Sequence, residues 1–255
     1  MRAVQDALCL TRVRILTGSG MLIDSLDLTV QPGECATLAG PSGSGKSALL
    51  AWIAGALDPG VRARGRVSIG GDDITTLPAE RRQVGMLYAE DLLFPHLTVA
   101  GNVAFALPRR IRGRDARRSM AERMLDEAGL DGLGGRDPEA LAPAQRVRVA
   151  LLRMLAAEPR ALLLDDPFGG LDPELRADLR QFALAQAASR GLPTLLATRA
   201  VADARAAGGP ALWLSGDGTA RAVPTEGRTA EAPRGAPAAP VPGIVQEARP
   251  RARRA

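Results

Sequence analysis

The chain has few aromatic residues, two cysteines and a single lysine. Aromatic residues make up 3% of its 255 residues, which is too few to form a stacking platform for nucleic-acid bases. Cys9 and Cys35 lie in apolar runs typical of strands, which predicts buried thiols in a reducing compartment rather than a disulfide or a metal site. Because residues 1–6 show no apolar signal-peptide run and no run approaches the ~18 apolar residues of a membrane span, we expect a cytoplasmic protein.

Charge is unevenly distributed along the chain. The formal net charge is +5, but from Gly216 to the end seven arginines oppose four acidic residues, so the rest of the chain is close to neutral. Because nucleic-acid binding generally requires a basic surface, the near-neutral charge of residues 1–215 predicts that the protein has no nucleic-acid partner. Residues 216–255 are dominated by Pro, Ala, Gly and Arg without periodicity, which is typical of a disordered tail.

One short stretch fits the phosphate-binding pattern G-x-x-x-x-G-K-[ST]. Residues 34–39 before it are typical of a buried strand, and residues 47–54 after it are typical of a helix, which is the context that a P-loop requires. The glycines allow the backbone N–H groups to turn towards a phosphate, and the helix N-terminus adds partial positive charge. The predicted nucleotide-binding residues are Gly40, Pro41, Ser42, Gly43, Ser44, Gly45, Lys46 and Ser47.

Lys46 is the only lysine among 33 basic residues, all the others being arginine. Arginine is a planar fork and lysine a compact point charge, so the two are not interchangeable in a tight phosphate cradle. We predict that Lys46 reaches the β- and γ-phosphates as a catalytic residue and that Ser47 holds Mg²⁺.

A second motif supplies acidic residues. Residues 161–164 form an apolar strand pattern that ends in Asp165, which we predict to be the second Mg²⁺ ligand. The next residue, Asp166, is the candidate general base for an attacking water. The predicted cofactors are therefore ATP and Mg²⁺.

The order of strand and helix patterns predicts an α/β fold of the P-loop NTPase class. Residues 7–15 and 22–30 predict an antiparallel N-terminal β-subdomain, and the later alternation predicts a mostly parallel core sheet. A mostly helical subdomain is expected at about 97–145, within an ATP-binding domain that covers residues 1–215.

Three further runs, in order, carry a resemblance. They are residues 93–103, with Phe-Pro-His-Leu-Thr-Val, residues 145–151, and residues 165–172, which end in Asp172. Together with the P-loop, they make residues 5–215 similar to the ATP-binding subunit of bacterial ABC transporters, of the importer type. The resemblance implies a dimer with two ATP molecules between each P-loop and the other subunit's signature motif. It also implies separate membrane permease subunits, a solute-binding protein, and a peripheral position at the inner face of the cell membrane.

The chain departs from this family at four positions. The Q-loop glutamine is replaced by Ala89, the catalytic glutamate by Asp166, and the switch histidine by Arg199, while the only histidine, His96, lies in another run. The family's Leu-Ser-Gly-Gly-Gln signature is replaced, and Asp172 of the D-loop would adjoin the signature motif in the dimer. The signature positions are Leu141, Ala142, Pro143, Ala144 and Gln145.

These departures affect the residues for ATP hydrolysis and leave those for ATP binding unchanged. The residues for Mg-ATP binding are present, whereas the groups that place water and stabilise charge are altered, so we expect tight ATP binding and slow hydrolysis as a homodimer. The alternative is a nucleotide-gated cassette without useful turnover, such as the degenerate half of a heterodimer. A P-loop small-molecule kinase and a cassette acting on DNA or ribosomes fit the order of runs and the charge less well. The transported solute is not readable from the chain.

Overall fold

The computed structural model describes residues 6–223. An antiparallel sheet near the N-terminus has the strand order β2-β1-β4-β5. Its strands are β1 (Leu8–Thr17), β2 (Gly20–Val30), β4 (Arg62–Ile69) and β5 (Asp72–Asp73). The predicted hairpin of the first two strands is confirmed, with Leu8 opposite Val30 and Thr17 opposite Gly20.

The core sheet has the order β10-β9-β3-β8-β7-β6. Its strands are β3 (Cys35–Ala39), β6 (Val84–Leu87), β7 (Ala161–Asp165), β8 (Thr194–Thr198), β9 (Ala211–Leu214) and β10 (Ala220–Ala222). All neighbours are parallel except β9 and β10. The central strands are short apolar runs because both sheet faces are covered. Their shared direction brings the carboxyl ends of β3, β8 and β7 to one edge of the sheet.

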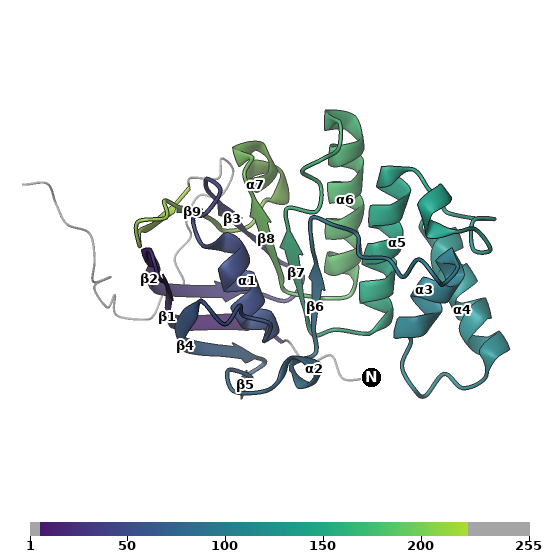
Figure 1. Ribbon diagram of the computed structural model, residues 1–255, viewed down its shortest axis with the longest axis horizontal. Coiled ribbons are helices and arrows are strands. Elements are labelled where there is room, and N and C mark those ends of the chain that lie inside the picture. Colours follow the sequence, from purple (N-terminus) through teal and green to yellow (C-terminus); the bar gives the residue numbers. More distant parts are fainter. Residues whose placement is uncertain (1–5, 224–255) are drawn as a thin grey trace, which may run out of the picture.

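Seven α-helices and one 3₁₀ turn complete the described part of the chain. They are α1 (Lys46–Ala54), α2 (Ala79–Arg82), α3 (Val99–Ala106), α4 (Arg114–Glu127), the 3₁₀ turn Pro138–Ala140, α5 (Pro143–Ala156), α6 (Pro173–Ser189) and α7 (Val201–Ala207). Helices α3, α4 and α5 gather at one end of the molecule, and the antiparallel sheet lies at the other (Figure 1). No helix within residues 6–223 has both the length and the apolar character to cross a membrane.

Helix α1 is anchored in the core between the two sheets. Leu49, Leu50 and Ile53 are completely buried in a cluster that also contains residues of both sheets. Burying each such side chain stabilises the fold by about 1.5–3 kcal/mol. This anchoring fixes the N-terminus of α1, and with it the loop that precedes the helix.

Two expectations about boundaries are modified. Strand β10 lies inside the range 216–255 that we assigned to a disordered tail, and it pairs with β9 through Ala220 opposite Leu214. Three residues that follow a glycine-rich turn are too few for a strand pattern to be recognised. The remainder of that predicted tail, 224–255, lies outside the described residues. The apolar cluster of α3 and α4 includes the face of α5 to Ala156, so their packing continues past the predicted 97–145 subdomain.

Candidate nucleotide-binding site

The predicted P-loop joins the carboxyl end of β3 to the N-terminus of α1. Gly40 has φ 152° and Gly45 has φ 94°, conformations that L side chains rarely adopt. A Cβ atom at Gly40 would lie 2.3 Å from the carbonyl oxygen of Leu214 in β9. The loop therefore requires glycine at Gly40 for space as well as for conformation. Between these glycines, Pro41, Ser42 and Gly43 are exposed, whereas Ser44 is buried.

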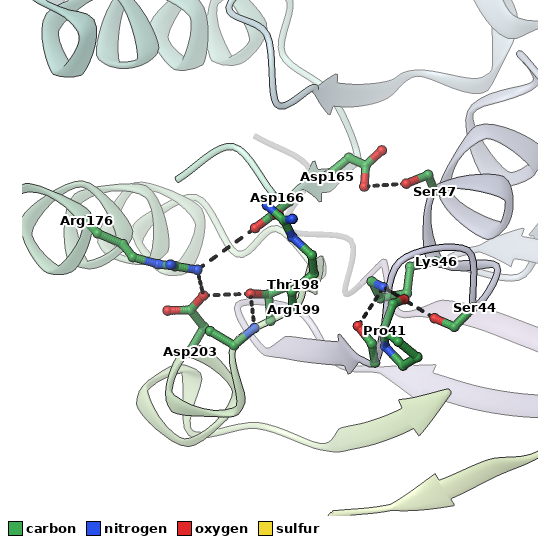
Figure 2. Close-up of polar contacts among 12 residues, drawn as sticks. Pro41, Ser44, Lys46, Ser47, Asp165, Asp166, Arg176, Thr198, Arg199 and Asp203 are labelled. Atoms are coloured by element: carbon green, nitrogen blue, oxygen red, sulfur yellow. Dashed lines mark hydrogen bonds and ion pairs between the residues drawn. The ribbon is translucent and has the colours of Figure 1, made fainter. Parts of the chain in front are cut away.

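Helix α1 begins without a side-chain cap. Its first backbone N–H groups have no partner within the helix, so they are available to an anion at the helix N-terminus. Lys46 Nζ lies over the same loop, where it donates to Gly40 O at 2.8 Å, to Pro41 O at 2.7 Å and to Ser44 Oγ at 3.3 Å (Figure 2). Lys46 is 7% exposed, so its charge is held inside the cradle.

Three charged groups influence this ammonium. Burial lowers the pKa of Lys46, and the positive charge of Arg199 lowers it further, while Asp166 and Asp165 act in the opposite direction. The side chains predicted to hold phosphate, to hold metal and to act as base are therefore close enough to interact electrostatically.

Asp165 lies at the end of β7 and contacts the P-loop helix directly. Ser47 Oγ donates to Asp165 Oδ1 at 2.9 Å (Figure 2). Burial raises the pKa of Asp165, and the charge of Asp166 adds to this, whereas the Ser47 hydrogen bond and Lys46 oppose it. A hydroxyl and a carboxylate oxygen suit Mg²⁺, whose other ligands would be phosphate and water oxygens. Residues 6–223 contain no group of three His, Cys, Asp or Glu side chains that would bind a metal unaided.

Asp166 has an unusual backbone and two arginine neighbours. Its φ is 48°, and its N–H donates to Ala197 O at 2.9 Å. Arg199 Nε donates to Asp166 Oδ2 at 2.9 Å, and Arg176 approaches Asp166 Oδ1 at 3.9 Å. Asp166 and Arg199, both predicted to depart from the family pattern, thus form an ion pair with each other.

A buried charge cluster lies directly behind this pair. Asp203 of α7 is 2% exposed and accepts hydrogen bonds from Arg176 at 2.6 Å, Arg180 at 2.7 Å and Thr198 Oγ1 at 2.6 Å (Figure 2 shows the contacts of Arg176 and Thr198). The sequence reasoning missed this cluster. A signal was present, because Arg176 and Arg180 lie four residues apart on one face of a predicted helix.

The predicted signature positions form the start of α5. Ala142 is the N-cap and Pro143 the first helical residue, where proline is tolerated because that N–H has no intrahelical acceptor. Ala142 N donates to Gln145 Oε1 at 3.0 Å, so the glutamine side chain completes the helix start. Leu141 is buried in the helical lobe, and Ala144 is partly buried.

The predicted Q-loop and signature positions share a cleft. Ala89 and Pro143 line a space of about 490 Å³ together with Pro167 and Gly170. Across the described residues, no hydrogen bond or ion pair joins positions 141–145 to the P-loop of the same chain. Asp172 is the N-cap of α6, where its Oδ1 accepts from Leu175 N at 3.1 Å.

The segment after Ala89 is tied to the helical lobe. Asp91 Oδ2 accepts from Arg146 Nε of α5 at 2.9 Å, so its carboxylate already has a partner. Phe94 N donates to Asn102 Oδ1 at 2.8 Å, and Asn102 is completely buried. These contacts explain the structural role of the residues 93–103 run: they hold the segment after β6 against α3 and α5.

Comparison with known proteins is consistent with this geometry. Residues 23–169 match the family model described as ABC transporter. The chain belongs to the ABC transporter family. It is 38% identical over 196 residues to the uncharacterized ABC transporter ATP-binding protein YnjD of Escherichia coli, covering 77% of this chain and 90% of that protein. By homology it is an ABC-type ATP-binding cassette, and the predicted family and fold class are confirmed.

Two further ABC proteins show the range of the similarity. The chain is 45% identical over 165 residues to the sulfate/thiosulfate import ATP-binding protein CysA of Synechococcus elongatus, covering 65% of this chain and 47% of that protein. It thus spans about half the length of this relative. The dimeric post-hydrolysis structure of the ATP-binding cassette MJ0796 bound to ADP and Pi matches with TM-score 0.73 and 27% identity, over 87% of this chain and 100% of that one.

Proposed function

We propose that this ABC cassette binds Mg-ATP as the ATP-binding subunit of an importer and hydrolyses it slowly. The observation that carries the proposal is the P-loop itself, in which Lys46 Nζ and the uncapped N-terminus of α1 converge while Ser47 meets Asp165 at 2.9 Å. Lys46 would contact the β- and γ-phosphates, and Ser47 and Asp165 would hold Mg²⁺. When bound, the metal would neutralise the developing phosphate charge.

Slow hydrolysis follows from the groups around Asp166. This carboxylate is one methylene shorter than glutamate and is already paired with Arg199 at 2.9 Å. Ala89 has no side-chain oxygen to hold a water, and Pro143 has no N–H to donate to a γ-phosphate. Loss of one placed electrostatic or general-base group costs about 10²–10³ in rate, and losses within one catalytic unit do not simply multiply.

The proposed partners are a second cassette and membrane permease subunits. Relatives named as import ATP-binding proteins support the importer assignment, and MJ0796 supports a dimer. We expect the permease subunits to dock around residues 90–98. A groove of about 630 Å³ lies beside this segment and is lined by Tyr88, Leu92 and Phe105, of which Phe105 is 65% exposed. This apolar groove between β6 and the helical lobe suits a permease element at the inner face of the membrane. A solute-binding protein would complete the importer.

A second candidate function is a nucleotide-gated cassette that depends on a different cassette for turnover. The pairing of Arg199 with Asp166 favours it, because the arginine competes with a water molecule for the carboxylate of the candidate base. In this heterodimer a partner would supply an intact signature motif to the P-loop of this chain.

One experiment tests both candidates. ATP binding and hydrolysis are measured side by side on the purified chain, with Lys46→Ala as the control. We expect wild type to bind Mg-ATP with turnover well below about 1 s⁻¹, the lower end of ordinary enzyme rates. Ordinary turnover would remove the slow-hydrolysis part of the proposal, and absence of Lys46-dependent binding would remove the proposal entirely. Binding without any turnover favours the second candidate.

A further inference from the structure

The phosphate loop has close neighbours from two segments that lie far apart in the sequence. On one side is β2, where a Cβ atom placed on Gly45 would lie 3.0 Å from Leu22 Cβ. On the other side is the end of β9, whose Leu214 carbonyl oxygen leaves no room for a Cβ atom on Gly40. The loop is therefore enclosed from both sides, in addition to the hydrogen bonds that Lys46 makes within it.

The turn between β9 and β10, residues 215–219, extends this contact from Leu214 to the middle of the loop. A Cβ atom on Gly216 would lie 3.2 Å from Ser44 Cα and 3.5 Å from Ser44 Cβ. Ser44 is 1% exposed, and its Oγ accepts the hydrogen bond from Lys46 Nζ (Figure 2). Gly216 thus lies against the residue that joins the loop to its lysine.

This turn has a defined shape of its own. Ser215 N donates to Thr219 O at 3.2 Å. Asp217 Oδ1 accepts from Thr219 N at 3.0 Å and from Thr219 Oγ1 at 2.6 Å. Gly216 has φ 84°, a conformation that residues with a side chain rarely adopt. The hydrogen bonds fix the turn, and the absence of a side chain at Gly216 lets it approach the loop.

The 215–219 turn is also bonded to the strand on the other side of the loop. Asp24 N of β2 donates to Gly218 O at 2.9 Å, and Ile23 forms a parallel bridge with Gly218. Ile23 Cγ1 would lie 3.4 Å from a Cβ atom on Gly45. Strand β2, the turn and the phosphate loop thus form a closed ring of contacts.

The backbone N–H groups of a phosphate loop bind an anion well only when they are already held in position, because ordering a loop on binding costs affinity. Small displacements pass readily through packed backbone, since protein interiors have few voids to absorb them. Gly216 packs on the backbone of Ser44, which is one of the predicted nucleotide-binding residues. A displacement of the turn is therefore transmitted to the phosphate site.

We propose that the 215–219 turn holds the phosphate loop in its binding conformation and that Gly216 is a positioning residue for nucleotide binding. A side chain at Gly216 displaces Ser44 by a few tenths of an ångström and misaligns the N–H groups that face the α- and β-phosphates. Because ATP and ADP share these phosphates, the two nucleotides lose affinity equally. This proposal rests on the proposed function, because it requires nucleotide in the P-loop.

The test compares the affinities of Gly216→Ala and Gly208→Ala for Mg-ADP and for Mg-AMPPNP, a non-hydrolysable triphosphate, by calorimetry. Gly208 caps α7, has φ 71° and has nothing within 4 Å of an added Cβ, so its variant carries the backbone strain without the contact. In Gly216→Ala we expect both affinities to fall about 5-fold, as for one weakened hydrogen bond. In Gly208→Ala we expect wild-type affinities, although urea unfolding should show a similar loss of stability in the two variants.

Asparagine at the same position distinguishes strain from contact. It tolerates positive φ better than alanine does, yet it still carries a Cβ atom. Gly216→Asn should therefore be more stable than Gly216→Ala, while its affinity for both nucleotides stays low. Recovery of the affinity together with the stability would show that strain alone acts, and it would overturn the proposal.

Hydrogen exchange of the wild-type chain gives a measurement that needs no substitution. Coupling is reciprocal, so a turn that orders the loop must itself be stabilised when nucleotide occupies the loop. We expect Mg-ADP to slow local exchange in residues 214–222 by about 3-fold or more. Residues 66–75, around β4 and β5 at the far edge of the antiparallel sheet, should be slowed less. Equal slowing of the two segments would contradict the coupling.

The outcomes also separate this proposal from the proposed function. Unchanged affinities in Gly216→Ala, or an equal fall in Gly208→Ala, overturn the role of the turn while wild-type binding still supports the P-loop function. A fall confined to Mg-AMPPNP also overturns it, because the contact would then act on the γ-phosphate rather than on the loop. Absence of any nucleotide binding in wild type overturns both.

Discussion

The phosphate loop and the Asp166 region meet at one edge of the core sheet, yet they are held by different forces. The loop is shaped by backbone geometry: Gly40 packs against the Leu214 carbonyl, and Lys46 bonds to backbone oxygens of its own loop. Asp166 is instead surrounded by charged side chains from α6 and from the end of β8.

Because of this difference, the two regions are expected to respond differently to changes in charge, salt and ligand. A loop held by backbone contacts keeps its shape when remote charges change. A region held by ion pairs depends on which partners are present, and its exposed pairs respond to salt and to ligands. Binding is therefore expected to be robust in this chain, and turnover is expected to be the adjustable step.

The largest expected effect comes from removing the central charge of the ion-paired region. Asp203→Ala leaves Arg176 and Arg180 without their shared partner, so we expect the free energy of unfolding to fall by about 3 kcal/mol. Urea unfolding measures the loss. Asp178→Ala is the control. Asp178 lies on α6 with Arg176 and Arg180, is 63% exposed and pairs with Arg148 of α5, so its loss should cost less than about 1 kcal/mol. Equal losses in the two variants would contradict the central role of Asp203.

The second largest effect is expected from a change in the phosphate loop. Lys46→Arg keeps the charge but replaces a compact ammonium that reaches Gly40 O and Pro41 O from inside a buried cradle. We expect Mg-ATP affinity to fall about 100-fold, as for loss of a strong charged hydrogen bond, with little change in stability. Calorimetric titration with Mg-ATP checks this. Retained affinity would show that charge alone, rather than the fit of the ammonium, determines binding.

A smaller effect, on the pH dependence of Mg²⁺-assisted ATP binding, is expected from Asp165. Its pKa is raised, chiefly by burial, so its carboxylate takes up a proton at a higher pH than an ordinary aspartate. As pH falls through that range, we expect the gain in ATP affinity given by Mg²⁺ to be lost, while folding is not weakened by this group because protonation relieves its burial. Titrations with and without Mg²⁺ across acidic pH measure the gain. In Asp165→Asn the Mg²⁺ gain, about 10-fold for one charged ligand contact, should be absent at every pH.

The smallest expected effect concerns the buried thiol at the start of β3. Burial, with a smaller contribution from Glu34, raises the pKa of Cys35 at the start of β3 to about 12. Because the thiolate is the reactive form, Cys35 should resist thiol reagents near about pH 8 until the protein unfolds, with or without ATP. In a Cys9→Ser variant, Cys35 is the one remaining cysteine, so all labelling is labelling of Cys35. Rapid labelling of the native variant would indicate that the core around the start of β3 opens more readily than its burial implies.

Much of the site could be predicted because its signals are local. The P-loop needs a strand, a loop and a helix in succession, and Asp165 follows an apolar strand, so both were found without knowledge of the fold. The tail boundary and the Asp203 cluster were not found. Strand β10 is only three residues long. Asp203 forms its ion pairs with arginines that lie 27 and 23 positions away in the chain, so no local pattern marks it as the centre of a charge cluster.

The α/β class, the phosphate loop and the positions predicted to depart from the family pattern all follow from the sequence, because they depend on neighbouring residues and on side-chain chemistry. The contact between two of those positions, Asp166 and Arg199, follows from the fold. Its strand order places β8 between β3 and β7, with Asp165 opposite Ala197, and so brings Arg199 to within 2.9 Å of Asp166. That pairing spans 33 positions and follows from strand order, which no local pattern encodes.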